Sequence, residues 1–269
     1  MLRCPKCARP LVKEEKRYVC ENGHSYDIAK EGYVNLILAN QKHSRNPGDN
    51  DESLAARRTF LSKGYYQPLA RHLASLVNEL VPEKGSFLDR GCGTGYYLNW
   101  IINHVDKEID YYAVDIARKG VAMTAKSNKN ATCFVGSVFH LPLGDDSLDG
   151  LLSVFTPYRG EEIARLIKPG GYVIAVNPGK DHLYQMKSIV YDSAYVNEEK
   201  GYDLPGFTLI RQKNIRYEKT LETREDIDTL WRMTPYYHTT YSGNNDRLKQ
   251  YDSIDTVIDF LVSVYRKEQ

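Results

Sequence analysis

The chain has 269 residues, of which 42% are hydrophobic and 26% are charged, and its formal net charge is +1 at pH 7. This length suffices for one large α/β domain and a small accessory module, with a sizeable core. The balanced charge excludes a protein that attracts nucleic acid or membranes through a general excess of basic residues.

The cysteine content and the apolar segments indicate a cytoplasmic location. Five cysteines, three of them at metal-binding spacing, fit a reducing compartment better than a disulfide framework. We expect no signal peptide, because Met1-Leu2 leads directly into Arg3 and Cys4 without an apolar segment. We also expect no membrane contact, because no stretch approaches the ~18 to 20 apolar residues of a membrane helix.

The N-terminal segment contains four side chains at the spacing of zinc ligands. Cys4 and Cys7 form a C-x2-C pair, and after twelve further residues Cys20 and His24 form a C-x3-H pair. Tetrahedral zinc prefers thiolate and imidazole ligands, so these residues predict a closed structural site with no position left for catalysis. A redox-active CxxC pair is the alternative, but such a pair normally follows a strand within a βαβ unit, and this one does not.

We assign residues 1–40 to this zinc-binding module. The residue pairs 11–12 and 18–19 can form the arms of a small hairpin between the two half-sites. A module of this size cannot bury enough core to fold alone, so zinc should supply much of its stability, on the order of 10 kcal/mol. Residues 3–17 are rich in Lys and Arg and predict a basic face. Residues 26–36 should pack on the zinc lobe.

Residues 41–84 are predicted to form a linker and two bridging helices. The polar segment 41–50 is rich in turn formers and indicates a loop or hinge, either a flap that faces RNA or cofactor or a plain linker. Asp51 can cap a helix that runs to about Lys63, with Gly64 as its stop. A second helix begins at Gln67 and ends before Pro82.

Residues 85–269 alternate between strand and helix patterns. Strands are expected at residues 87–88, 111–114, 132–135, 148–155 and 172–176, helices at 96–105, 119–127 and 161–167, and a turn at 168–171. In the tail, two β-prone segments at 207–221 and 253–265 flank a helical stretch at 223–233 and can form an antiparallel pair. The predicted fold class is α/β: a doubly wound Rossmann-like sheet with an antiparallel C-terminal edge, plus the small zinc-binding β module.

A glycine-rich turn follows the first strand of this domain. Gly91, Gly93 and Gly95 open the next helix, and glycine permits a tight turn and close backbone approach to a ligand. Asp115 ends the following strand, where a carboxylate can accept hydrogen bonds from ribose hydroxyls, and Asp89 can orient the loop or face an ammonium group. The G-x-G-x-x-G dinucleotide pattern is not met, and no Lys-Ser or Lys-Thr follows the turn, which excludes a P-loop.

These motifs resemble those of class I S-adenosylmethionine-dependent methyltransferases. The resemblance lies in the D-x-G-C-G-x-G run at 89–95, the acidic end of the second strand, the segment 136–142 and the K-P-G-G turn at 168–171. Arg90 departs from the pattern, because the family usually has an aliphatic residue there. Its guanidinium must reach solvent or a partner, since an unpaired buried charge is costly. A Rossmann-like domain that binds another nucleotide, or none, is the alternative.

Taken in order along nearly the whole chain, the motifs resemble bacterial 23S rRNA (guanine-N1)-methyltransferases. Besides the zinc half-sites, the resemblance includes the segments 29–35, 47–49, 56–58 and 64–68. It implies S-adenosylmethionine as cofactor, a guanine in a 23S rRNA hairpin loop as substrate, a structural zinc and a homodimer. The sibling group that methylates a nearby guanine, linked to macrolide resistance, is the alternative, and the segments 47–49 and 56–58 favour the first group.

The resemblance also implies particular cofactor contacts. Gly93 and Thr94 match the family's loop contact, Tyr66 matches a contact upstream of the second bridging helix, and His182 matches a contact after the fifth strand. From the residues alone, Tyr66 is more typical of an interface aromatic and His182 of a surface or capping histidine. The predicted cofactor-binding set is Tyr66, Asp89, Gly91, Gly93, Thr94, Gly95, Asp115 and His182. Cys92 and Cys133 are expected to be small packing residues.

The implied reaction is an in-line displacement at the sulfonium methyl group, and no catalytic base is assigned. Guanine N1 carries a proton at neutral pH and must lose it, and RNA loops offer unstacked bases that a pocket can hold. The segment 155–158, Phe-Thr-Pro-Tyr, should face the substrate, although a plain turn is the alternative. A small-molecule methyltransferase and a non-enzymatic RNA-binding protein remain as other functions.

Overall fold

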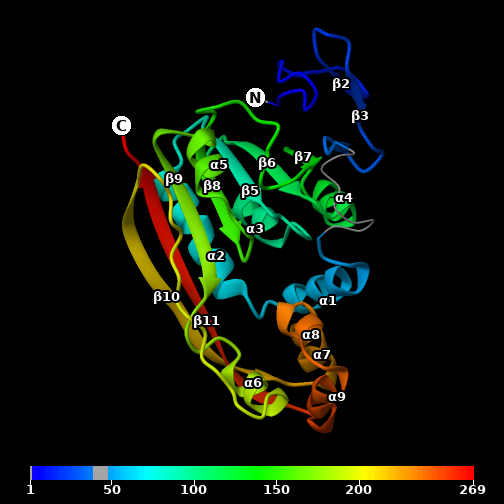
Figure 1. Cartoon of the computed structure of the whole chain (residues 1–269), viewed down its shortest axis with the longest axis vertical. Helices are drawn as coiled ribbons and strands as arrows, with labels where there is room; N and C mark the ends of the chain where they lie inside the picture. The colour runs from blue at the N-terminus through cyan, green and yellow to red at the C-terminus, as the bar shows by residue number, and fades with distance from the viewer. Residues whose placement is uncertain (1, 39–47) are drawn as a thin grey trace.

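The computed structural model describes residues 2–38 and 48–269 of the chain. These residues form a small N-terminal module and a larger domain in which helices cover a mixed sheet (Figure 1). Most of the predicted loop at 41–50 lies outside the described residues, as does Met1. Within the described parts of the chain, no helix combines the length and the apolar character needed to cross a membrane.

The N-terminal module is a three-stranded antiparallel sheet. Its strands are β1 (Val12–Lys13), β2 (Arg17–Val19) and β3 (Ser25–Asp27). Val12 pairs with Val19, which confirms the predicted hairpin between the zinc half-sites. The module docks on the large domain through a short bridge between Leu2 and Leu143 and a 2.7 Å hydrogen bond from Arg3 N to Pro142 O.

The large domain is built on an eight-stranded sheet. Its strands are β4 (Tyr33–Asn35), β5 (Ser86–Arg90), β6 (Asp110–Asp115), β7 (Ala131–Val135), β8 (Leu148–Val154), β9 (Ile167–Pro178), β10 (Phe207–Leu221) and β11 (Ile254–Lys267). The spatial order is β10-β11-β9-β8-β5-β6-β7-β4, and the strands from β4 to β9 are parallel. β11 is antiparallel to β9 and to β10. The predicted doubly wound sheet with an antiparallel C-terminal edge is confirmed.

Helices cover both faces of this sheet. They are α1 (Asp51–Ser62), α2 (Gln67–Leu80), α3 (Tyr96–His104), α4 (Arg118–Ser127), α5 (Gly160–Leu166), α6 (Tyr184–Val190), α7 (Arg224–Arg232), α8 (Pro235–Thr239), α9 (Ser242–Asn245) and the 3-10 helix η2 (Asp246–Gln250). Because side chains alternate along a strand, Phe87 packs under α2, α3 and α4, whereas Leu88 packs with α5 on the opposite face.

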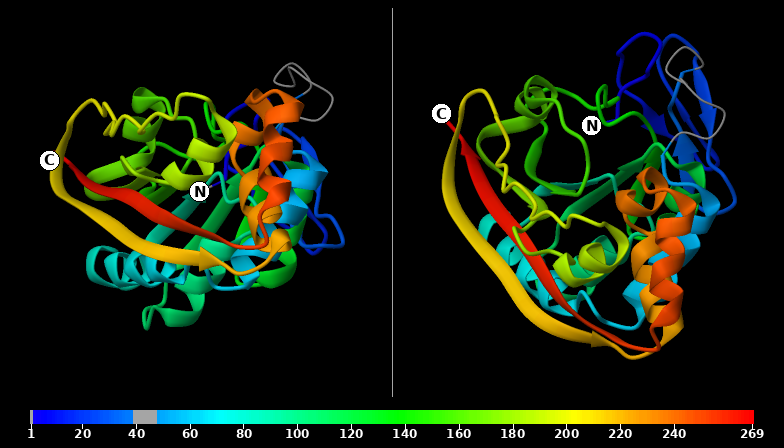
Figure 2. Two further views of the ribbon diagram at one scale, coloured as in Figure 1. Left: turned by 90° about the horizontal axis from the view of Figure 1, so that it is seen from below. Right: turned by 60° about the horizontal axis from the view of Figure 1, so that its bottom comes forward.

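The segment between β10 and β11 forms a C-terminal lobe of α7, α8, α9 and η2. β10 and β11 run side by side as a long curved pair that leads to this lobe (Figure 2). The lobe packs on α1, where Ser53 Oγ lies 2.8 Å from His238 Nε2. This arrangement places the lobe opposite the carboxyl ends of the central parallel strands.

Three local predictions differ from the structure. The turn expected at 168–171 lies within β9, which begins at Ile167. The N-cap of α1 is Asn50 rather than Asp51, because Asn50 Oδ1 accepts the 2.8 Å hydrogen bond from Ser53 N. Residues 26–36 do contact the zinc module, because Ile28 N donates a 2.8 Å hydrogen bond to Lys16 O, but Tyr33–Asn35 also pair in parallel with β7 and extend the large sheet. The N-terminal segment is therefore attached to the edge of that sheet through main-chain hydrogen bonds.

Candidate functional site

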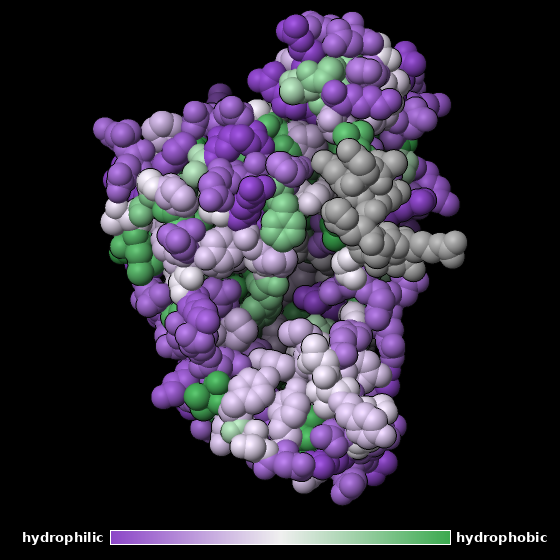
Figure 3. Space-filling view, in the orientation of Figure 1, coloured by the Kyte–Doolittle hydropathy of each residue, from purple (hydrophilic) through white to green (hydrophobic). Residues whose placement is uncertain are grey.

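A cavity of about 770 Å³ lies at the carboxyl ends of β5, β8 and β9. Figure 3 shows the surface hollowed between the α/β domain and the C-terminal lobe. Ligands of open α/β sheets bind at this edge of the strands. The cavity lies between several segments of the chain. It is lined by the end of β5 and the glycine turn (Asp89, Gly91, Cys92, Gly93, Thr94), the loop after β8 (Phe155, Thr156, Pro157, Tyr158), α1 and the N-cap of α2 (Ser53, Arg57, Tyr66), the end of β9 and the segment after it (Asn177, His182) and the lobe (Met233, Tyr236, His238).

The glycine turn forms one wall of the cavity. Gly91 and Gly93 both have positive φ, +78° and +50°. A Cβ atom at Gly91 would lie 2.2 Å from Thr156 Oγ1, so the turn packs directly against the loop after β8. A Cβ atom at Gly93 would contact only Arg57 Cδ, at 3.8 Å, so this glycine leaves the cavity wall open. Gly95 caps α3 and packs against Thr124, behind the cavity.

Asp89 points a buried carboxylate at this cavity. The residue is 3% exposed, and its Oδ2 atom has no hydrogen-bond partner among the residues that the structure describes. Burial, and secondarily the charge of Asp115, raise the pKa of Asp89 to about 7. A buried carboxylate oxygen without a partner fits a cationic group such as an ammonium, which would lower the cost of ionising it.

Asp115 ends β6 beside the same turn. Its Oδ2 accepts a 2.9 Å hydrogen bond from Gly93 N, and its Oδ1 accepts a 2.8 Å hydrogen bond from Ala117 N. Burial raises the pKa of this carboxyl group, while the two backbone N–H groups oppose the rise. Each carboxylate oxygen can accept more than one hydrogen bond, so the side chain can also accept from ribose hydroxyls.

Tyr66 and His182, which are far apart in the sequence, lie together in the structure. Their ring centroids are 6.2 Å apart, and both rings pack on Phe260 of β11, at 4.8 and 5.1 Å. Phe155 completes the cluster at 6.1 Å from His182. The structure thus brings both predicted residues to one apolar wall of the cavity.

His182 is a neutral, oriented imidazole. Its Nδ1 atom accepts a 3.2 Å hydrogen bond from Asp259 N, which assigns the proton to Nε2. Burial, followed by the charge of Lys187, lowers the pKa of His182 to about 3. The ring is therefore a fixed hydrogen-bond donor and packing surface, not a proton carrier near neutral pH.

Several cavity residues were missed by the sequence interpretation. Arg57 donates to Asp49 Oδ2 at 2.7 Å and to Met233 O at 3.2 Å, so it connects α1 to the C-terminal lobe. His238 enters from α8. Phe260 of β11 lies behind the cavity wall, where its ring packs on Tyr66 and His182. In the sequence, Arg57 stands out only as part of the family resemblance at 56–58, and no local pattern marks the other two positions.

Arg90, the departure in the glycine motif, is fully buried and has partners. Its guanidinium donates to Ser153 Oγ at 3.0 Å, to Pro157 O at 2.6 Å and to Val138 O at 3.4 Å. The sequence predicts that this guanidinium reaches either solvent or a hydrogen-bond partner. In the structure it reaches partners. Cys92 and Cys133 are buried as expected, and burial raises the pKa of both thiols.

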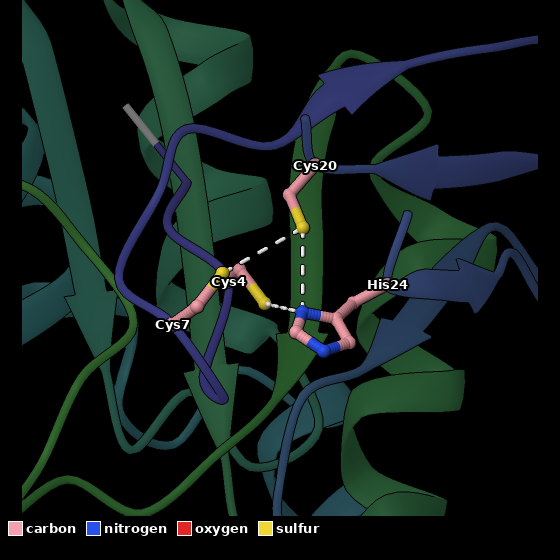
Figure 4. Close-up of side chains that lie close together, drawn as sticks. All are labelled: Cys4, Cys7, Cys20 and His24. Carbon is pink, nitrogen blue, oxygen red and sulfur yellow. Dashed lines mark hydrogen bonds between the residues drawn. The ribbon is translucent and has the colours of Figure 1, made fainter. Parts of the chain in front are cut away.

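The four predicted zinc ligands converge in the N-terminal module (Figure 4). Their ligand atoms all lie within 4.8 Å of one another. His24 Nδ1 is 3.5 Å from the sulfur atoms of Cys4 and Cys20, and the sulfur atoms of Cys7 and Cys20 are 3.7 Å apart. Tetrahedral zinc with bonds of ~2.0 to 2.3 Å requires separations of about 3.3 to 3.8 Å between ligand atoms. These three separations lie in that range, and the Cys3His donor set is one that zinc prefers, so the cluster fits this metal.

Comparisons with protein families cover both parts of the chain. A zinc-ribbon family described as "RlmA, N-terminal" matches residues 2–45, and a family described as "Methyltransferase domain" matches residues 88–175. These matches coincide with the Cys3His cluster and with the sheet that carries the glycine turn.

Individual relatives cover nearly the full length. A protein of Streptomyces fradiae named "23S rRNA (guanine(748)-N(1))-methyltransferase" is 33% identical over 255 residues, which are 92% of this chain and 88% of that protein. YxjB of Bacillus subtilis (strain 168), whose name assigns it provisionally to the 23S rRNA (guanine-N1)-methyltransferases, is 29% identical over 96% of this chain and 94% of its own. Among solved structures, a SAM dependent methyltransferase from Aquifex aeolicus is 22% identical, covers 50% of this chain and 76% of its own, and has a TM-score of 0.42.

Proposed function

We propose that this chain, which belongs to the family of 23S rRNA (guanine-N1)-methyltransferases, transfers a methyl group from S-adenosylmethionine to N1 of one guanine in a hairpin loop of 23S rRNA. The observation that carries the proposal is the pairing of a Cys3His zinc cluster with a cavity at the carboxyl edge of a methyltransferase sheet in one chain. A location in the cytoplasm, where rRNA is modified, is part of the proposal.

The predicted cofactor residues suit the parts of S-adenosylmethionine. Asp89, with an unpaired buried carboxylate oxygen among the described residues, would hold the ammonium group. Asp115 would accept from the ribose hydroxyls, and the turn from Gly91 through Gly93 and Thr94 to Gly95 would let the backbone approach the ligand. Tyr66 and His182 would form the apolar wall beside it. The bound cofactor supplies an electrophilic methyl group on its sulfonium.

The chain's own residues would act mainly by alignment. Holding guanine N1 in line with the methyl group can account for ~7 to 11 kcal/mol of the barrier. The Phe155–Tyr158 loop lines the cavity and offers aromatic surface for an unstacked base. N1 must also lose its proton, and a positioned acceptor would assist that step.

The zinc module would contact the folded rRNA. Its exposed side chains include Lys6, Lys13 and Lys16, which can neutralise phosphates. The module is attached to the large domain at Leu143 and through β4, so a hairpin bound to it would be held in a fixed relation to the cavity.

The decisive test is mass mapping of 23S rRNA from a strain that lacks this protein. Loss of one methyl group on a single hairpin-loop guanine is expected, and complementation with the intact gene should restore it. An unchanged map would refute the proposal, and methyl transfer to metabolites but not to rRNA would favour a small-molecule methyltransferase. A correctly folded protein that binds no S-adenosylmethionine would favour a non-enzymatic RNA-binding role.

The same map identifies the guanine. The motifs at 47–49 and 56–58 favour the first group over the sibling group that methylates a nearby guanine. The similarity to the Streptomyces fradiae enzyme, whose name specifies guanine 748, makes that base the second candidate. The two outcomes differ in the modified fragment and cannot be confused.

We further propose that the protein acts as a homodimer. Light scattering coupled to size exclusion should give twice the chain mass of 30.8 kDa. A single species with the mass of one chain at micromolar concentration would contradict this part of the proposal.

A further inference from the structure

Arg90 is a buried cation whose partners are all uncharged. It is the last residue of β5, is 0% exposed, and donates to one hydroxyl and two carbonyl groups. Burial lowers the pKa of Arg90 to about 10, so the guanidinium stays protonated near neutral pH. Burying such a charge is costly, and an apolar residue of similar volume would often be as stable. Stability of the strand alone therefore does not explain an arginine at this position.

The partners of Arg90 lead to the loop after β8. Pro157 O, its closest acceptor at 2.6 Å, belongs to this loop. Ser153 Oγ, a second acceptor, lies 3.0 Å from Tyr202 Oη, and Tyr202 Oη donates to Thr156 O at 3.1 Å. One buried network thus holds two consecutive carbonyl groups of the loop.

The loop held by this network is conformationally demanding. Phe155 has a φ of +51°, a left-handed conformation that non-glycine residues rarely adopt. Such a residue persists only when its surroundings determine its conformation. The ring of Tyr202 also stacks on Tyr158, with centroids 3.8 Å apart and planes at 9°. Phe155 and Tyr158 both line the cavity, so the network fixes the aromatic surface of that wall.

We propose that Arg90 is a positioning residue, which acts through Ser153 and Tyr202 to fix the Phe155–Tyr158 loop and thereby aligns the target base with the methyl donor. This inference rests on the proposed function, because the loop is taken as the wall that receives the guanine. Arg90 lies between Asp89 and Gly91, so the same residue connects the cofactor turn to the substrate wall. It touches neither substrate nor cofactor in this role.

The cleanest variant is Tyr202→Phe. It removes a single oxygen, keeps the ring that stacks on Tyr158 and leaves β5 unchanged. On a 23S rRNA hairpin we expect kcat to fall about ten-fold or more, since a misplacement of about 1 Å can cost ~100-fold, while the Kd for S-adenosylmethionine stays within about two-fold. Tyr111→Phe is the matched control, because Tyr111 Oη is buried without a hydrogen-bond partner among the described residues. It should leave kcat and the Kd unchanged.

Variants of Arg90 test the other end of the network. Arg90→Leu should lower kcat at least as much as Tyr202→Phe, and Arg90→Lys, which keeps the charge and one donor group, should restore part of the loss. The double variant Arg90→Leu/Tyr202→Phe should lose less than the product of the two single losses, because both act through one loop. If Arg90→Leu does not fold, Tyr202→Phe alone still tests the proposal.

A second readout does not depend on RNA. Arg159 is exposed and directly follows the loop, so trypsin cleavage after it reports on loop order. Cleavage should be several-fold faster in Tyr202→Phe than in wild type or Tyr111→Phe. Unchanged kcat and unchanged cleavage would overturn the proposal, as would a loss of cofactor affinity equal to the loss of kcat. If trypsin cleaves the wild-type protein as slowly as expected for an ordered loop, but the protein methylates no rRNA hairpin, the proposed function would be overturned instead.

Discussion

At the scale of single residues, Asp89 carries the most direct pH dependence. Burial, and then Asp115, raise the pKa of Asp89 to about 7, well above the ordinary value of 3.8. The folded chain without cofactor therefore binds the proton of the Asp89 carboxyl group more tightly than the unfolded chain does. The contribution of this protonated group to the free energy of unfolding is fully present below the unfolded pKa and is lost as the pH rises through about 7.

Cofactor binding should have the opposite dependence on pH. If the ionised Asp89 holds the ammonium group, affinity for S-adenosylmethionine rises as the pH passes through the pKa of about 7. Calorimetric titration should show a Kd about ten-fold lower at about pH 8 than at about pH 6, because the ionised fraction changes by that factor.

The control for this prediction is Asp89→Asn, which removes the titrating group and keeps the side-chain shape. Its Kd should be weaker than that of the wild type and nearly independent of pH. A wild-type Kd that stays constant between about pH 6 and pH 8 would mean that Asp89 orients the loop instead of binding the cation.

The sequence predicted many of the residues around the cavity, but not their partners. The spacing of Gly91, Gly93 and Asp115 follows from the turn between strand and helix, which is local. The contacts of Arg90 with Pro157, and of His182 with Phe260, join distant segments of the chain. Such contacts depend on the order of strands in the sheet and leave no local pattern, so a sequence can show that Arg90 needs a partner without showing which.

At the scale of elements, the packing between the glycine turn and the loop after β8 predicts the effect of Gly91→Ala. The added Cβ would lie 2.2 Å from Thr156 Oγ1, at a φ of +78° that disfavours a side chain. Overpacking of this kind costs about 1 to 3 kcal/mol, so the free energy of unfolding in urea should fall by that amount.

Gly93→Ala provides the comparison. Its Cβ would meet only Arg57 Cδ at 3.8 Å, so the loss of stability should be limited to the left-handed backbone, about 1 kcal/mol. The methyl group would project toward the cavity and should weaken S-adenosylmethionine binding more than it weakens folding. A larger stability loss for Gly93→Ala than for Gly91→Ala would contradict this division between packing and ligand access.

The elements themselves were predicted unevenly. The strands and helices from β5 to β9 follow the chain's alternation of apolar strands and amphipathic helices, and the long strands β10 and β11 are β-prone throughout. β4 was missed, because a strand of three residues is too short for a period-two pattern. Its partner β7 lies about 100 residues later, with Tyr33 opposite Cys133, and this pairing exists only in the folded domain.

At the scale of the whole molecule, β4 connects the zinc module to the cavity domain. Tyr33 pairs with β7, its hydroxyl accepts a 2.8 Å hydrogen bond from Arg118 Nε of α4, and Leu36 N donates to Val135 O at 2.9 Å. β6, which carries Asp115, is the next strand in the sheet. The module is thus fixed to the edge of the sheet, while the residues proposed to bind the cofactor lie at the N-cap of α2, on β5 and in the turn after it, on β6 and in the segment after β9.

This arrangement predicts separate effects of zinc removal on the two activities. Chelation, or the ligand variant Cys20→Ser, should disorder β1, β2 and β3, because metal binding supplies most of the folding free energy of such a module. Methyl transfer to a 23S rRNA hairpin, followed with radiolabelled S-adenosylmethionine, should fall to a small fraction of its initial rate. The Kd for the cofactor should change by no more than about three-fold, because the core beneath α2, α3 and α4 does not include the zinc ligands.

Zinc must be quantified in each sample, and adding zinc back to the chelated protein should restore methyl transfer, whereas Cys20→Ser should not be rescued. If the zinc-free protein methylates the hairpin at the full rate, the module has no part in recognition, and the attachment through β4 serves stability alone. If cofactor binding is lost together with methyl transfer, disorder has spread from β4 through β7 to Asp115 on β6. The two measurements together therefore separate recognition of RNA from support of the cofactor site.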